Sequence, residues 1–136
     1  MGAPLILTSP HSGNYYPKFY IDNLITSLDL SRSIEDMYVN EFIENYNDRE
    51  ITILTNKYSR AVIDLNRNIN ELDNTLVESG KGLKFVNTQK VQLGIGLIPV
   101  QTAKGKIIFK KKFSLEKFIF LQKNVYLKWH EELRNN

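Results

Sequence analysis

The sequence predicts an α/β fold with a mostly parallel or mixed sheet. Short runs of β-forming residues alternate with segments of helical periodicity along the chain. The composition is ordinary for a folded protein, with 42% hydrophobic and 24% charged residues among 136. A chain of this length is expected to form one domain.

Short apolar runs predict the strands. The first two are Leu5–Thr8 and Ile51–Leu54, and Ala61–Leu65 has the same character. Two further runs, Ile95–Val100 and Lys106–Phe109, are expected to pair across a turn at residues 104–105.

Apolar spacing predicts two helices. Residues 31–45 place Val39, Phe42 and Tyr46 on one face, and Ser33 and Asp36 have the spacing of a capping box. Asp36 is expected on the same inward face. Ser114–Leu133 is expected to form a second amphipathic helix, whose apolar positions are Leu115, Phe118, Leu121, Val125, Trp129 and Leu133. The polar segment from Asn66 to about Lys84 is expected to be a long loop.

Charge is distributed unevenly along the chain. Residues 1–79 carry a net charge of −6 and residues 80–136 carry +9, with Lys110–Lys112 as the densest basic run. A solvated face explains these lysines better than a nucleic-acid site, because no nucleic-acid-binding motif accompanies them. No apolar run approaches the roughly 20 residues of a membrane-spanning helix. The chain has no cysteine, so a cytoplasmic setting fits.

The stretch PLILTSPHSG, residues 4–13, ends an apolar run with a proline, a histidine and a glycine. Ligands of α/β sheets bind at the carboxyl ends of strands. His11 is therefore a candidate site residue, and a structural histidine in a loop is the alternative.

The stretch YSRAVIDLNR, residues 58–67, surrounds an apolar run with Arg60, Asp64, Asn66 and Arg67. Guanidinium groups match carboxylates in shape and charge, so this cluster is suited to an anionic substrate. An ion pair of Asp64 with Arg60 or Arg67 that orients a loop is the alternative reading.

These segments also carry a family resemblance. In order, PLILTSPHSGNYYP, SIEDMYVNEF, YSRAVIDLNRNINELD, GLIPV with GKII, and YLKWHEEL resemble N-formylglutamate amidohydrolases, from Pro4 to Leu133. The resemblance implies a three-layer α/β/α sandwich similar to zinc carboxypeptidases and aspartoacylases. It also implies one zinc ion and hydrolysis of N-formyl-L-glutamate to formate and L-glutamate.

The resemblance assigns the metal ligands. His11 matches the family's first ligand histidine, and Asp36 is favoured for the second ligand, with Glu35 as the fallback. Zinc bound there would lower the pKa of a bound water and polarise the formyl oxygen.

The resemblance also assigns substrate contacts. Arg60 is expected to polarise the scissile carbonyl or hold substrate, and Asn66 with Arg67 to clamp the α-carboxylate. Asp64 belongs to the same substrate-binding segment, and His130 matches a position near the substrate.

Family members are roughly twice as long as this chain, and their later half supplies a further ligand histidine and the general base. We therefore expect residues 1–136 to be a single partial domain with an incomplete zinc site and little activity alone. A complementary C-terminal chain or a homo-oligomer would complete the site. The alternative is a non-catalytic remnant that binds anions or nucleic acid through the lysine-rich half.

Overall fold

In the described part of the chain, the sheet has two parallel strands. The structure is a computed structural model that describes residues 5–46, 50–78 and 82–136. Strands β1 (Leu5–Ser9) and β2 (Ile51–Thr55) pair along their whole length, from Leu5 opposite Ile51 to Ser9 opposite Thr55. Both strands are where the sequence predicts them, and the fold is a small α/β domain. Because the strands are parallel, the segments that follow them start from the same edge of the sheet.

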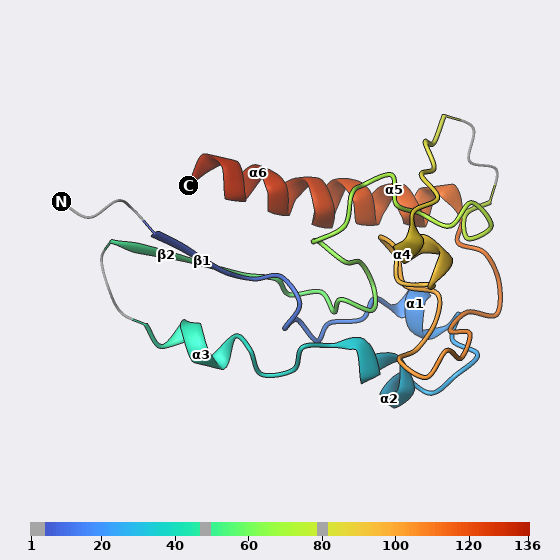
Figure 1. The fold of residues 1–136 in the computed structure, drawn as a ribbon, viewed down its shortest axis with the longest axis horizontal. Helices are drawn as coiled ribbons and strands as arrows, with labels where there is room; N and C mark the ends of the chain where they lie inside the picture. The colour runs from blue at the N-terminus through green and yellow to red at the C-terminus, as the bar shows by residue number, and fades with distance from the viewer. Residues whose placement is uncertain (1–4, 47–49, 79–81) are drawn as a thin grey trace.

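Helices account for most of the remaining regular structure. The described residues contain α1 (Lys18–Ile21), α2 (Leu28–Ser31), α3 (Glu41–Glu44), α4 (Gln89–Gln92), α5 (Leu115–Leu121) and α6 (Lys128–Asn135). In Figure 1 the β1–β2 pair lies between α6 on one side and α3 on the other. No helix in the described parts of the chain is long and apolar enough to cross a membrane.

The helix predicted over residues 114–133 is confirmed. The hydroxyl of Ser114 caps its first turn by accepting a hydrogen bond from the Lys117 amide, and a π-helical segment (Gln122–Leu127) joins α5 to α6. Figure 1 shows them as one continuous element. Its buried face consists of Phe118, Leu121, Val125 and Trp129, in the same core as residues 61–65.

The prediction of a strand at Ala61–Leu65 is wrong. This segment forms turns, in which the Val62 amide donates to the Ser59 carbonyl at 2.9 Å and the Asp64 amide to the Leu97 carbonyl at 2.7 Å. Its side chains are almost completely buried. An apolar run predicts burial, but it does not distinguish a strand from a buried loop whose backbone amides form hydrogen bonds outside a sheet.

The prediction of one helix over residues 31–45 is also wrong. A 3₁₀ turn (Arg32–Ile34) follows α2, Glu35 is extended, Tyr38 has φ +66°, and the helix resumes only at α3. The expected apolar face is not buried, since Phe42 is 84% exposed. The backbone leaves the helix at Glu35, whose side chain bonds to distant parts of the chain.

The remaining predictions concern loops. The long loop is confirmed, because residues 66–78 and 82–84 contain no helix or strand, while residues 79–81 of the prediction lie outside the described residues. The predicted pairing of residues 95–100 with 106–109 is reduced to one antiparallel bridge, Gln101 with Ile107, closed by a turn in which Gly105 has φ +73°.

Candidate active site

The candidate site begins where β1 ends. The hydroxyls of Ser9 and Ser12 are 2.6 Å apart across the turn that carries His11, and Ser12 pairs with Ser59 in an isolated bridge. At Gly13 the turn packs directly on the segment after β2, since a Cβ there would lie 2.3 Å from the Tyr58 carbonyl oxygen. The sequence thus places the His11 imidazole over the strand ends, with its side chain 12% exposed.

Both ring nitrogens of His11 face carboxylates. Nδ1 lies 3.1 Å from Oδ2 of Asp36, and Nε2 lies 2.8 Å from Oδ1 of Asp64. The side chain of Asp36 is 48% exposed, whereas that of Asp64 is 1% exposed. The imidazole therefore connects a buried carboxylate to one that is open to ligands.

Asp64 is the centre of the site. Its Oδ1 also accepts a hydrogen bond from the Asn66 amide at 2.9 Å, and its Oδ2 lies 3.0 Å from Nε of Arg60 and 3.5 Å from Nη2 of Arg67. Burial by itself would raise the pKa of Asp64, but the hydrogen bond and charge of His11, together with Arg60 and the Asn66 amide, hold its pKa below the usual value. Asp64 is therefore a carboxylate at neutral pH, and it holds His11 and both arginines in place.

The two arginines are held differently. Arg60 also approaches Asp36, with Nη1 3.7 Å from Oδ1, so its guanidinium spans both carboxylates that face His11. Arg67 is 8% exposed and donates from Nε to the Ile95 carbonyl at 3.0 Å and from Nη1 to the Asn66 carbonyl at 3.4 Å. Two of the guanidinium nitrogens of Arg67 are thus hydrogen-bonded to backbone carbonyls of this chain.

Glu35 lies apart from His11, although it precedes Asp36. Its carboxylate accepts hydrogen bonds from the hydroxyls of Tyr16 and Ser59 and from Nε of Arg32. Burial and the bond to Glu35 raise the pKa of Tyr16 well above its usual value, so this hydroxyl stays protonated and donates. The structure thus brings Asp36 to His11 and holds Glu35 in a separate set of hydrogen bonds.

His130 lies on the opposite side of the segment that carries Asp64. Its Nε2 is 3.1 Å from the Leu65 carbonyl oxygen, and its ring packs against Tyr126 at 4.4 Å between centroids. The hydroxyl of Tyr126 donates to the Arg67 carbonyl at 2.7 Å. The C-terminal helix therefore supports the backbone of residues 65–67, and His130 contacts this backbone and not His11.

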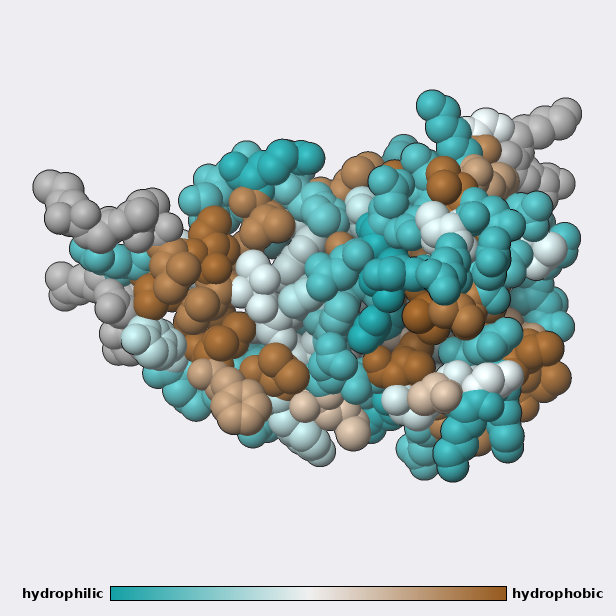
Figure 2. Space-filling view, viewed as in Figure 1, coloured by the Kyte–Doolittle hydropathy of each residue, from teal (hydrophilic) through white to brown (hydrophobic). Residues whose placement is uncertain are grey.

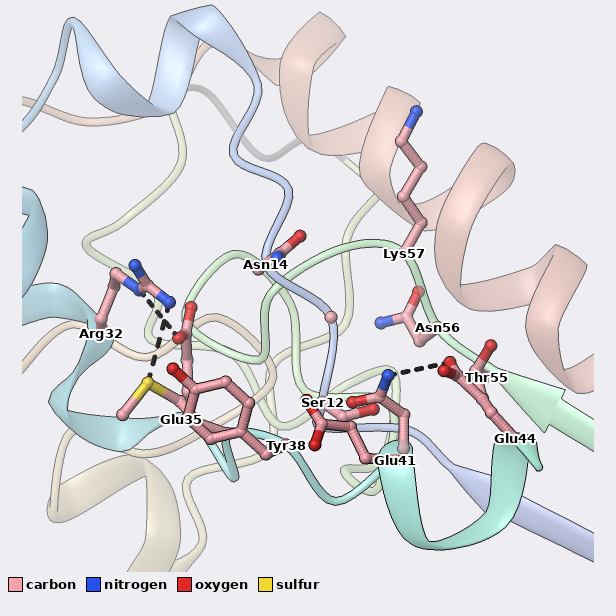
Figure 3. A pocket seen from close by; sticks show the side chains of 13 residues that line it. Ser12, Asn14, Arg32, Glu35, Tyr38, Glu41, Glu44, Thr55, Asn56 and Lys57 are labelled. Carbon is pink, nitrogen blue, oxygen red and sulfur yellow. Dashed lines mark hydrogen bonds and ion pairs between the residues drawn. The ribbon is translucent and has the colours of Figure 1, made fainter. Parts of the chain in front are cut away.

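A cavity of about 390 Å³ adjoins the turn after His11 and is shown in Figure 3. Its walls come from the turn after β1, the segment around α3 and the end of β2. Sequence reasoning missed its polar lining, which includes Asn14, Arg32, Asn56 and Lys57. These residues carry no shared motif, and only the fold brings them together.

Within the described residues, no group of three or more histidine, aspartate or glutamate side chains has the arrangement of a metal site. His11 and Asp36 form a pair of the donor types that zinc accepts. Lys110–Lys112 lie elsewhere, in an exposed bend whose backbone is bonded to Asn23.

Comparison with known families explains why these residues converge. Residues 3–136 match N-formylglutamate amidohydrolase in a scan of protein families. The chain belongs to the N-formylglutamate amidohydrolase family. A search of curated proteins found no match.

Among solved structures, the chain is similar to the N-formylglutamate amidohydrolase of Ralstonia eutropha JMP134, with a TM-score of 0.86 and 26% sequence identity. The match covers 97% of this chain and 46% of the other chain. The protein thus spans about half the length of the enzyme it resembles, and the candidate site lies within the shared half.

Proposed function

We propose that this chain provides one half of the active site of a zinc-dependent amidohydrolase that converts N-formyl-L-glutamate and water to formate and L-glutamate. Family membership supports the reaction class. The observation that carries the proposal is the His11 imidazole held between Asp36 and Asp64 at the strand ends. We further propose that the two-stranded sheet is part of a three-layer α/β/α sandwich of the zinc-carboxypeptidase type.

His11 and Asp36 are the proposed zinc ligands of this chain. The pair is accessible from solvent through Asp36, and Asp64 fixes the other nitrogen of the imidazole, as a carboxylate does behind many metal-bound histidines. A catalytic zinc site has three protein ligands, so the third ligand comes from outside the described residues. Zinc, when bound, lowers the pKa of a coordinated water and polarises the formyl group.

The arginines provide the proposed substrate contacts. Arg60 is placed to interact with the scissile carbonyl because it lies beside Asp36 and is partly exposed. Asn66 and Arg67 would bind the substrate α-carboxylate, and His130 would support this region. In the reaction, the oxygen of water bonds to the formyl carbon, the carbon–nitrogen bond breaks, and the nitrogen gains a proton as glutamate leaves. A carboxylate of the missing half accepts the proton from water.

The proposed partner is a polypeptide equivalent to the part of the R. eutropha chain that this protein does not cover. Figure 2 shows an apolar area at the end of the molecule where Figure 1 places β1, β2 and α3. The exposed apolar side chains of these segments are Leu5, Met37, Tyr38, Val39, Phe42 and Tyr46. Parallel sheets are normally covered on both faces, so this exposed apolar area favours a partner that packs against these segments.

The test is formate release from N-formyl-L-glutamate with added zinc, measured for the chain alone and with that second polypeptide. We expect little release from the chain alone and turnover from the mixture, which His11→Ala abolishes. N-formylglycinamide, which lacks both carboxylates, should be a poor substrate in the same assay. A folded mixture that forms a complex and yet shows no turnover, or turnover that His11→Ala leaves unchanged, would refute the proposal.

A further inference from the structure

The carboxylate of Glu35 is buried and fully engaged. Its side chain is 2% exposed, and it receives three hydrogen bonds: Oε1 accepts from the Tyr16 and Ser59 hydroxyls, and Oε2 accepts from Nε of Arg32. One of the two dashed lines from Arg32 in Figure 3 marks its contact with Glu35. Its oxygens thus face donors of this chain, whereas the neighbouring Asp36 is about half exposed.

The three donors come from different parts of the fold. Tyr16 follows the turn that carries His11, and Ser59 directly precedes Arg60. Ser59 also accepts a hydrogen bond from the Ala61 amide at 3.1 Å, which fixes its own position. Glu35 therefore ties the segment that carries Asp36 to the two segments that carry His11 and Arg60.

The backbone at this point has no other regular support. The 3₁₀ turn ends at Ile34, Glu35 is extended, and residues 36–40 lie outside any helix or strand. Asp36 itself has fewer contacts: one hydrogen-bond partner, His11 at 3.1 Å, and a 3.7 Å approach to Arg60, and half of its side chain is exposed to water. The segment that carries Asp36 is therefore attached to the rest of the fold mainly through the preceding residue, Glu35.

We infer that Glu35 is a positioning residue, whose buried carboxylate holds Asp36 against Nδ1 of His11, and that it is not itself a metal ligand. The inference rests on the proposed function only for the role of Asp36 as a ligand. Glu35→Gln tests it with little change in size. The three donors then face an amide, and one of them meets an N–H group in place of an oxygen.

The first measurement needs neither metal nor substrate. The chain contains only His11 and His130, so ¹⁵N spectra of the ring nitrogens contain two sets of signals. We expect Glu35→Gln to shift the two ring-nitrogen signals of His11 in the same directions as Asp36→Asn does, by a smaller amount, and to leave both nitrogens of His130 unchanged. In the Asp36→Asn background, Glu35→Gln should change none of the four signals. A wild-type His11 spectrum in Glu35→Gln, or shifts opposite in direction to those in Asp36→Asn, would overturn the inference.

The second measurement separates positioning from ligation. Zinc is titrated into the wild type, the two single variants and the double variant, with affinity followed by the His11 signals. Outer residues that orient metal ligands contribute about 10- to 100-fold in affinity, so Glu35→Gln should weaken binding by that factor. It should weaken binding no further once Asp36 is Asn. A further loss in that background would mean that Glu35 acts independently of Asp36 and would overturn the inference.

Folding is controlled with a milder change. Tyr16→Phe removes one of the three donors and should shift the same His11 signals by a smaller amount, so it decides the question if Glu35→Gln does not fold. An unchanged His11 spectrum in a folded Tyr16→Phe chain would then overturn the inference. If the wild-type chain alone binds no zinc, its two proposed ligands do not hold the metal without the third, and the turnover assay of the mixture then decides the proposed function. The ring-nitrogen spectra still decide whether Glu35 positions Asp36.

Discussion

Asp64→Asn should be among the most destabilising single changes in this protein. The substitution keeps the shape of the side chain but removes a buried charge that faces Arg60 and Arg67. An amide has one acceptor oxygen where the carboxylate has two, so either the two arginines, or His11 and the Asn66 amide, face an NH2 group instead. Breaking a buried ion pair from one side costs about 3–5 kcal/mol. Arg60 is partly exposed and Arg67 keeps its bonds to backbone carbonyls, so we expect the lower end, about 3 kcal/mol.

Urea unfolding followed by tryptophan fluorescence measures this loss, because the single tryptophan, Trp129, is buried in the core. With an m-value of about 2 kcal/mol/M, the midpoint should fall by roughly 1.5 M. Asp22→Asn is the matched control: its pair with Lys18 is exposed on both sides and should contribute less than about 1 kcal/mol. A loss for Asp64→Asn no larger than for Asp22→Asn would refute the view that Asp64 is the centre of the site.

Three further changes test the fold around the site. Gly13→Ala forces a Cβ to within 2.3 Å of the Tyr58 carbonyl oxygen, so the same urea assay should show a loss of about 2 kcal/mol, and an unchanged midpoint would contradict the close packing of this turn. Phe118→Ala empties a fully buried position and should lower the free energy of unfolding by about 3–5 kcal/mol. Phe120→Ala, at a position of the same helix that is 40% exposed, should lower it by less. The hydrogen bond from the Asn68 amide, helped by the Thr88 hydroxyl, lowers the pKa of Glu71 in the folded chain. The ionised Glu71 carboxylate therefore stabilises the folded chain at pH values above its unfolded pKa of about 4.3, and this stabilisation is lost as the pH falls through the lower folded pKa. Stability measured between pH 6 and pH 3 should therefore fall less steeply in Glu71→Gln than in wild type, and equal slopes would contradict this assignment.

The parts of the fold that follow local rules could be predicted from the sequence. The strands at residues 5–9 and 51–55 follow their runs of β-forming residues, although most of their side chains are only half-buried or exposed, and the helix after Ser114 has an apolar spacing and a cap that match its burial and its start. The run Ala61–Leu65 was misleading because its amides bond to Ser59 and Leu97, contacts that no local pattern contains. Burial was predicted correctly there, while the backbone conformation was not.

The candidate site shows the same division. His11 and the residues around Arg60 were found because they stand at the ends of apolar runs, and the structure brings both to Asp36. Sequence reasoning weighed Asp64 as one partner of an ion pair, but its fourfold contacts arise only when separate loops meet. The helix predicted through Glu35 failed for a related reason. The buried Glu35 carboxylate has two distant donors, Tyr16 and Ser59, besides its neighbour Arg32, and these contacts outweigh the weak preference of a short amphipathic segment for helix.

The ordering of burial within the site has a consequence for its chemistry. The side chains of Asp64 and Glu35 are buried, and each accepts hydrogen bonds from several donors of this chain. Asp36 remains half exposed and contacts His11 and Arg60. A carboxylate that exchanges ligands needs access to solvent, as Asp36 has. A carboxylate that holds other side chains in place needs buried contacts, because exposed ion pairs are weak in water. The two buried carboxylates therefore provide rigidity, and the open face of Asp36 is where the proposed metal ion and substrate would bind.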